Sequence, residues 1–178
     1  MNFPLPGFLP RLARGLVLAF GLSSALLLAG CTTDSGPGRP GSVAPPYSFE
    51  TWDGQTLSQE DFAGRLVVLN FWATWCVPCR QEMPAFQRLY SQYRDQGVAI
   101  VGIAVQDDPV VARQFTGDLG ISYPTGGDLR NQSFQRFRVL GLPTTLSIDK
   151  DGKIIRRWDG EPTEQQLTAV VRELLSAS

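Results

Sequence analysis

The sequence of 178 residues predicts one α/β domain in which a mixed sheet lies between layers of helices. Three observations predict this class. From residue 47 onward, apolar runs rich in β-branched residues alternate with segments whose apolar residues repeat at helical spacing. A strand pair around Asp151-Gly152 must be antiparallel, so the sheet is mixed. The composition, 43% hydrophobic and 19% charged, is typical of a globular protein with a core.

The domain is expected to start with short elements. Residues 47–58, YSFETWDGQTLS, contain Asp53-Gly54, which is a turn signal between two short strands. Residues 58–62 predict a short helix capped by Ser58, with Asp61 three residues later.

Two buried strands with a helix between them follow. RLVVLNFWA (65–73) and VAIVGIAVQ (98–106) are apolar and rich in β-branched residues, as buried strands are. Residues 77–97 between them predict a helix that stops at Gly97, and Pro84 inside it predicts a kink. Its apolar positions at helical spacing are Met83, Phe86, Leu89, Tyr90 and Tyr93.

The remaining elements are, in chain order, a helix over 108–120, an extended piece over 121–125, a short helix over 131–139, a hairpin over 144–160 and a helix over 163–177. Pro109 lies in the first turn of its helix, where no amide partner is required. Asp151-Gly152 forms the turn of the hairpin, and Thr163 caps the closing amphipathic helix.

Residues 1–30 are not expected to belong to the domain. Two arginines precede an uncharged apolar run, residues 15–30, which fits a signal peptide and is short and Gly/Ser-interrupted for a membrane span. The run ends in LAGC (28–31), which resembles the lipobox of bacterial lipoproteins. This resemblance implies cleavage before Cys31 and lipidation of its thiol. The alternative is an ordinary signal peptide or a transmembrane anchor with an incidental cysteine.

The segment that follows Cys31 is rich in Gly, Pro and Ser. TTDSGPGRPGSVAPP (32–46) has almost no large apolar residue to bury, so residues 31–46 predict a flexible tether. The expected organisation is a signal peptide over 1–30, this tether, and one domain over 47–178.

Charge and composition exclude several classes of function. A net charge of −1 argues against nucleic-acid binding through phosphate contacts. The chain has no histidine, which removes Ser-His-Asp and Cys-His catalysis and every histidine-ligated metal site. Thiol chemistry is the main common chemistry that remains.

Cys76 and Cys79 lie directly after a predicted buried strand, where a helix begins. Their spacing allows a disulfide. The first thiol lies near a helix N-terminus, whose free amides favour a thiolate, and Pro78 suits the first turn. We therefore predict a redox pair in which Cys76 is the exposed nucleophile and Cys79 the buried resolving thiol.

Three other interpretations of this pair compete. A zinc site needs about four ligands, and only two thiolates remain once Cys31 carries lipid. A purely structural disulfide over so short a loop stabilises little, and two inert core thiols are the third alternative. We expect no metal and no cofactor beyond the redox-active disulfide.

Two motifs carry a resemblance to a known family. VVLNFWATWCVPCRQEMP (67–84) resembles the active-site segment of thioredoxin-fold proteins, and its glutamate is similar to that of membrane-anchored ResA/TlpA-like thiol-disulfide oxidoreductases, which are related to the redoxin and AhpC/TSA proteins. GLPTT (141–145) resembles the loop that holds the cis-proline of that family. The resemblance covers about 47–178. It implies a three-layer thioredoxin fold with an N-terminal β-hairpin extension and a central helix-strand insertion over 107–127.

The resemblance also implies roles for single residues. Pro143 would be the cis-proline, whose loop pairs with substrate and excludes metal from the thiols. Trp75 would shield the pair and contact partners, although a core position is its alternative. The implied substrate-binding residues are Trp75, Val77, Pro78, Leu142 and Pro143.

Asn70 stands where thioredoxin itself has a buried aspartate. An amide cannot accept and return a proton as a carboxylate does. We therefore expect Glu82, which matches the acidic residue that tunes thiol acidity in the subfamily, to exchange the proton of Cys79. A solvated surface charge is the alternative for Glu82.

By resemblance, the protein is expected to reduce protein disulfides, such as those of apocytochrome c, with electrons from an integral membrane thiol carrier. It would act outside the cytoplasm as a monomeric, membrane-anchored lipoprotein that binds no nucleic acid. A peroxiredoxin-like peroxidase is one alternative, since Thr74 and Arg80 flank Cys76. A non-catalytic lipoprotein adaptor is the other.

Overall fold

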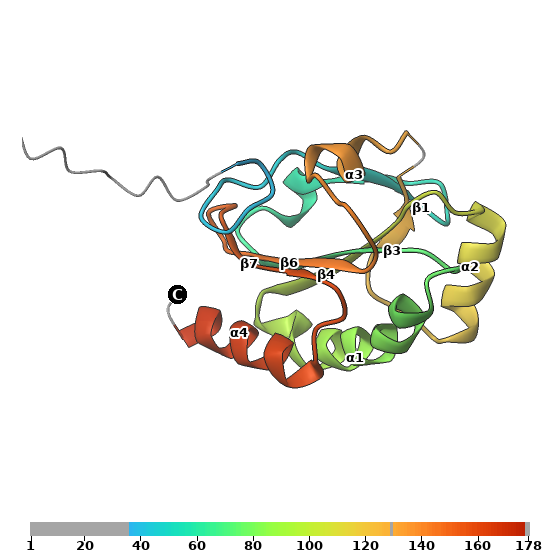
Figure 1. Cartoon of the computed structure of the whole chain (residues 1–178). Helices are drawn as coiled ribbons and strands as arrows, with labels where there is room; N and C mark the ends of the chain where they lie inside the picture. Colours follow the sequence, from blue (N-terminus) through green and yellow to red (C-terminus); the bar gives the residue numbers. More distant parts are fainter. Residues whose placement is uncertain (1–35, 129, 177–178) are drawn as a thin grey trace, which may run out of the picture. The chain divides into compact units, whose positions relative to one another are not determined.

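The computed structural model describes residues 36–128 and 130–176, which form a seven-stranded mixed sheet with helices on both faces (Figure 1). The strands are β1 (Ser48–Thr51), β2 (Thr56–Ser58), β3 (Leu66–Trp72), β4 (Val98–Ala104), β5 (Thr125–Gly127), β6 (Thr144–Ile148) and β7 (Ile154–Asp159). The helices are α1 (Val77–Tyr93), α2 (Pro109–Asp118), α3 (Gln132–Arg136) and α4 (Glu164–Ser176), with 3₁₀ turns η1 (Gln59–Phe62) and η2 (Arg94–Gln96). The signal peptide and Cys31 lie outside the described residues.

The strand order is β2-β1-β5-β4-β3-β6-β7. β3, β4 and β5 are parallel to their neighbours in this set, whereas β6, β7, β1 and β2 pair antiparallel. The hairpin β1–β2 is the expected N-terminal extension. It joins the sheet through β5, which with α2 forms the expected insertion. The predicted thioredoxin fold is therefore confirmed.

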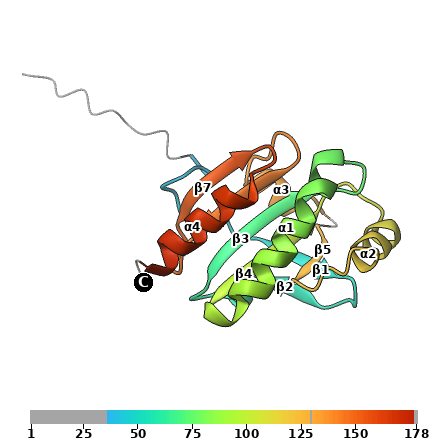
Figure 2. The same cartoon turned by 90° about the horizontal axis from the view of Figure 1, so that it is seen from below.

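The central strands β3 and β4 are buried along their whole length and divide two apolar clusters. Because side chains alternate along a strand, Val68 and Trp72 face one side and Leu69 and Phe71 the other. Helices α1 and α4 lie together over the first face, as Figure 2 shows from below. Phe137, beyond α3, packs on the second face. The end of β3 is thus held from both sides, and the CxxC segment leaves the sheet there.

Ser58 and Asp61 form the predicted capping box of η1. Helix α1 continues through Pro84, and the kink expected there stays a prediction. The extended piece expected over 121–125 overlaps the observed strand by one residue, because β5 starts at Thr125. Pro124 just before it has no N–H for a ladder, although its carbonyl accepts a hydrogen bond from the Gly102 amide.

Residues 36–46 are ordered against the sheet, so the prediction that they form a flexible tether is wrong. Backbone N–H···O bonds join this segment to β7 and its preceding turn: Gly41 to Ile154 (2.8 Å), Ile154 to Ser42 (2.9 Å) and Ala44 to Gly152 (2.8 Å). Composition indicates how little apolar surface a segment can bury, but it does not reveal backbone pairing with an open sheet edge. The ordered domain therefore begins before Tyr47. We call residues 36–44 the strap.

Within the part of the chain that the structure describes, no helix is both long and apolar enough to cross a membrane.

Candidate active site

Cys76 and Cys79 are joined by a disulfide, with their Cα atoms 5.3 Å apart. Cys76 is the N-cap of α1 and has extended backbone angles, and its sulfur accepts a hydrogen bond from the Cys79 amide (3.3 Å). Cys76 is 5% exposed and Cys79 is fully buried. The prediction that Cys76 is exposed is therefore wrong, although Cys76 is still the more accessible of the two sulfur-bearing residues. A sulfur at this position meets the free amides of the first turn, which stabilise a thiolate.

The loop before Cys76 is held by β4 and the residues that follow it. Thr74 donates from both its amide and its hydroxyl to the Asp107 carboxylate. The Trp75 indole is 60% exposed, and its Nε1 donates to the carbonyl of Gln106 (3.1 Å). Trp72, in contrast, is fully buried. Trp75 is therefore not a core residue, and it presents an apolar face to solvent beside the disulfide.

The GLPTT loop lies beside the dithiol because of strand register. Thr144 pairs with Phe71, so Pro143 lies next to the end of β3. The Leu142–Pro143 peptide bond is cis, as expected for Pro143. The Pro143 carbonyl accepts a hydrogen bond from Gly160 (2.9 Å). The loop therefore joins the CxxC segment at one end of the sheet.

The side chains expected to contact a substrate differ in how accessible they are. Val77 is 61% exposed at the first turn of α1, while Pro78 and Leu142 are half-buried and Pro143 is buried. Leu140, which the sequence did not single out, is 92% exposed just before the cis-proline loop. Its position two residues before Leu142 is the sequence feature that could have marked Leu140 as a candidate substrate contact.

Glu82 is buried behind the dithiol, not solvated on the surface. It is 2% exposed and lies one turn beyond Cys79 on α1. Its Oε1 accepts from the Asn70 amide nitrogen (2.7 Å), which also donates to the hydroxyl of Thr145 (3.0 Å). Glu82 Oε2 and Asn70 Oδ1 are buried and have no hydrogen-bond partner among the described residues.

Burial raises the pKa of Glu82 to about 8, although the hydrogen bond from Asn70 opposes the shift. A carboxyl with this pKa is mostly protonated at neutral pH. It can exchange a proton with a thiol, whose ordinary pKa is about 8.5, at little cost. Thr145 was missed from the sequence, because its contact with Asn70 joins strands 75 residues apart.

No group of three or more histidine, cysteine, aspartate or glutamate side chains within residues 36–128 and 130–176 could hold a metal ion.

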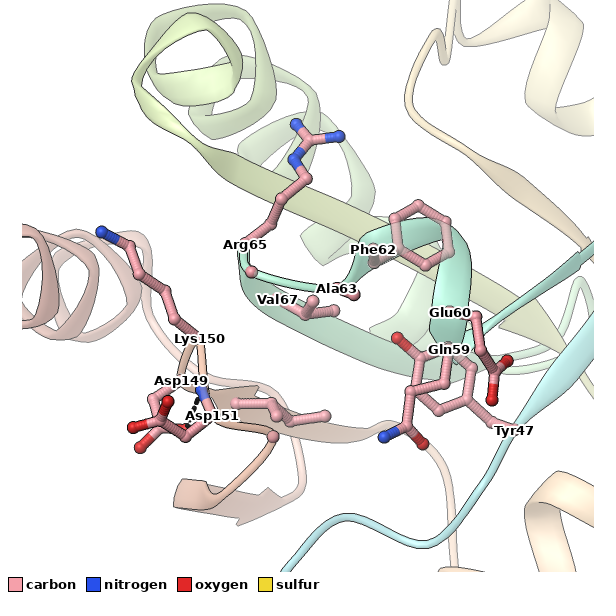
Figure 3. Close-up of a pocket in the computed structure, with 13 residues that line it drawn as sticks. Tyr47, Gln59, Glu60, Phe62, Ala63, Arg65, Val67, Asp149, Lys150 and Asp151 are labelled. Carbon is pink, nitrogen blue, oxygen red and sulfur yellow. Dashed lines mark hydrogen bonds between the residues drawn. The ribbon is translucent and has the colours of Figure 1, made fainter.

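A cavity of about 200 Å³ lies at the opposite end of the β3–β6 pair (Figure 3). It is lined by Val67 and Ile148, which pair with each other, and by η1 and the β6–β7 turn. Four residues of strand separate this pair from Phe71 and Thr144, which is about 13 Å. Figure 3 shows Arg65 and Lys150 directed away from the hollow rather than into it. This cavity contains no thiol and is not part of the candidate active site.

The fold and its dithiol define a class: a thioredoxin-fold thiol-disulfide oxidoreductase, with the CxxC disulfide at the start of its first long helix. More narrowly, the chain belongs to the AhpC/TSA family, which it matches over residues 40–157.

Several known proteins are similar over most of the chain. Thiol-disulfide oxidoreductase ResA of Bacillus thuringiensis subsp. konkukian is 34% identical over 134 residues, which cover 75% of this chain and 78% of that protein. ResA of Bacillus anthracis is 31% identical over 167 residues, covering 92% and 96%. The crystal structure of a putative thiol:disulfide interchange protein DsbE from Chlorobium tepidum has 26% identity and a TM-score of 0.72, and the match covers 77% of this chain and 98% of that one.

Proposed function

We propose that the protein is an extracytoplasmic, membrane-tethered reductase of protein disulfides that uses Cys76 and Cys79 as its dithiol. The observation that carries this proposal is the pair itself: a sulfur at the N-terminus of α1, a fully buried second sulfur, and the buried Glu82 behind them. Relatives named ResA and DsbE support the class, and the ResA/TlpA resemblance supports cytochrome c maturation as the process.

The reaction begins with the reduced enzyme. The Cys76 thiolate attacks one sulfur of the substrate disulfide, so one S–S bond breaks and a mixed disulfide forms, and the departing substrate sulfur takes a proton. Cys79 then gives its proton to the Glu82 carboxyl in the fraction of molecules in which that carboxyl is ionised, and attacks the Cys76 sulfur. The enzyme disulfide forms and the second substrate sulfur leaves as a thiolate, which takes a proton from Glu82 or from water. The substrate has then gained two electrons and two protons as a dithiol. An integral membrane dithiol donor would reduce Cys76–Cys79 again.

Thr74 and Arg80 weaken the case for a peroxidase. The Thr74 hydroxyl donates to Asp107, and the Arg80 guanidinium lies over the Phe115 ring, 5.4 Å from its centroid. Both side chains are thus engaged away from Cys76, so the two groups that would activate a peroxidatic thiol have other partners.

Trapping identifies the substrate, and the reduction potential tests the direction of electron flow. Cys79→Ser lacks the resolving thiol, so a cell expressing it should accumulate disulfide-linked complexes through Cys76, and mass spectrometry would identify the partners. The doubly changed Cys76→Ser, Cys79→Ser chain is the control and should trap nothing. A reduction potential of the dithiol above about −150 mV would place the protein among oxidants and overturn the reductase.

The anchor is tested separately from the chemistry. Labelling cells with a radioactive fatty acid should label the full chain but not Cys31→Ser, and the labelled chain should sediment with membranes. A Cys31→Ser chain that carries label equally would remove the lipoprotein from the proposal.

A further inference from the structure

Arg157 lies at the centre of a closed hydrogen-bond network on β7. Its side chain is 6% exposed. Nε donates to both oxygens of Asp159 (2.9 and 3.1 Å), and Nη2 lies 2.8 Å from the same carboxylate. Nη1 donates to the carbonyls of Gly38 (3.0 Å) and Phe137 (2.8 Å), and Nη2 donates to that of Arg138 (3.2 Å). Each of the three guanidinium nitrogens therefore donates at least one hydrogen bond, and Nη2 is also ion-paired with Asp159.

The acceptors of this network lie at both ends of the loop that carries Pro143. Phe137 and Arg138 precede the loop, and Arg138 has a left-handed φ of 49°. At the other end, Asp159 is the register partner of Thr144 and accepts from its hydroxyl (3.4 Å). The next residue, Gly160, donates to the Pro143 carbonyl. One guanidinium thus joins the chain entering the loop to the strand that supports its exit.

The strap completes the network from a third direction. Gly38 has a φ of +80°, and a Cβ there would lie 2.5 Å from the Phe137 carbonyl oxygen. Only glycine can approach this closely. Gly41 has a similar φ of +89°, but a Cβ there would meet nothing within 4 Å. Replacing either glycine by alanine strains the backbone, but only the change at Gly38 also creates a clash with Phe137. Comparing the two variants therefore separates the effect of backbone strain from that of the clash.

We propose that Arg157 is a positioning residue for the cis-proline loop, and that the Gly38 carbonyl of the strap completes its site. The proposal rests on the proposed function, because the loop matters only if its backbone pairs with a polypeptide substrate. A small disulfide that meets only Cys76 needs no such pairing. The network should therefore affect polypeptide substrates and spare small ones.

The test compares two substrates with one set of reduced variants. The substrates are a synthetic unstructured peptide with one internal disulfide, and glutathione disulfide. Arg157→Gln should raise KM for the peptide about tenfold with little change in kcat, and should leave the rate with glutathione disulfide within about twofold of wild type. Arg156→Gln is the matched control, since Arg156 is exposed on the same strand, and it should change neither substrate.

Further variants test the same contacts if Arg157→Gln folds poorly. Gly38→Ala should raise KM for the peptide in the same direction, and Gly41→Ala should not. Arg157→Lys keeps the charge but not the fork, so it should behave like Arg157→Gln. Recovery of wild-type KM in Arg157→Lys, or an equal loss with both substrates in Arg157→Gln and Gly38→Ala, would overturn the proposal. If wild-type protein did not reduce the peptide at all, the proposed function itself would fail.

Discussion

The two ends of the β3–β6 pair differ in how their carboxyl groups are hydrogen-bonded. At the dithiol end, Glu82 Oε2 and Asn70 Oδ1 are buried without a partner among the described residues. At the opposite end, Asp149 Oδ1 accepts from the amides of Asp151 (3.0 Å) and Lys153 (2.8 Å) and closes the β6–β7 turn. One end buries a carboxyl that has an unpartnered oxygen, while the other uses a carboxylate to complete a turn.

A cavity alone does not locate the chemistry of this protein. The cavity of Figure 3 has mixed charges at its rim and one orphan polar atom, the Tyr47 hydroxyl, which is a neutral phenol. The dithiol end combines a reactive pair, a buried acid and exposed apolar side chains. Burying a polar group without a partner is costly, and at the dithiol end the group concerned is an acid one helical turn from Cys79.

Removing the attacking thiol should have the largest effect at the dithiol end. We expect Cys76→Ser to lower the rate of peptide disulfide reduction by about 10³-fold or more, because a serine hydroxyl is not ionised at neutral pH and cannot form the mixed disulfide. Stopped-flow measurement of the reduced protein checks this. Lys150→Ala, at the far end, is the control and should react as wild type. Full activity in Cys76→Ser would show that Cys76 is not the attacking thiol.

Glu82 should control how stability depends on pH. Its folded pKa of about 8 lies above the ordinary 4.5, so between these values the unfolded chain ionises while the folded chain stays protonated. Stability from this group is complete below pH 4.5 and decreases as pH rises to about 8. Glu82→Gln removes the loss, so the oxidised variant should gain up to about 5 kcal/mol over wild type above pH 8.

Urea unfolding of the oxidised protein at several pH values measures this difference. Glu173→Gln changes an exposed glutamate on α4 and should leave the pH dependence unaltered. A Glu82→Gln curve parallel to wild type across this range would show that burial does not hold the proton. The same variant should slow release of the mixed disulfide, because Cys79 loses its proton acceptor.

The sequence predicted the dithiol end better than its surroundings. The spacing of Cys76 and Cys79 and the apolar runs of the strands are local signals, and the motif around Pro143 is equally local. Burial of Glu82 was also accessible, since it lies on α1 among Cys79, Met83 and Phe86 at helical spacing.

Long-range contacts could not be predicted in this way. The bond from Asn70 to Thr145 depends on which strands become neighbours, and the strap pairs through backbone groups that its composition does not reveal. The composition around Gly38 is typical of a linker, and only the structure shows that the Phe137 carbonyl lies against this glycine. Sequence patterns report local burial, whereas these features depend on topology.

Trp75 should have an intermediate effect. We expect Trp75→Ala to raise KM for a peptide disulfide about fivefold, because an exposed indole beside the disulfide offers a large apolar contact that alanine lacks. Steady-state kinetics measures this change. Val110→Ala removes a similarly exposed apolar side chain, 75% exposed on α2, and should leave KM unchanged. Equal effects of the two changes would mean that apolar exposure in general, not this end of the sheet, recruits substrate.

Changes in the β6–β7 turn, at the end of the β3–β6 pair opposite the dithiol, should have the smallest effect on function. There we expect a loss of stability without a loss of activity. Asp149→Ala removes the acceptor of two turn amides, so we expect unfolding free energy to fall by about 1 kcal/mol. Lys150→Ala, in the same turn, should change it by less than about 0.5 kcal/mol. Peptide reduction should stay at the wild-type rate in both, because the β3–β6 ladder separates this turn from the dithiol. A selective loss of activity in Asp149→Ala would mean that the two ends are coupled through the sheet. The β6–β7 turn would then contribute to catalysis.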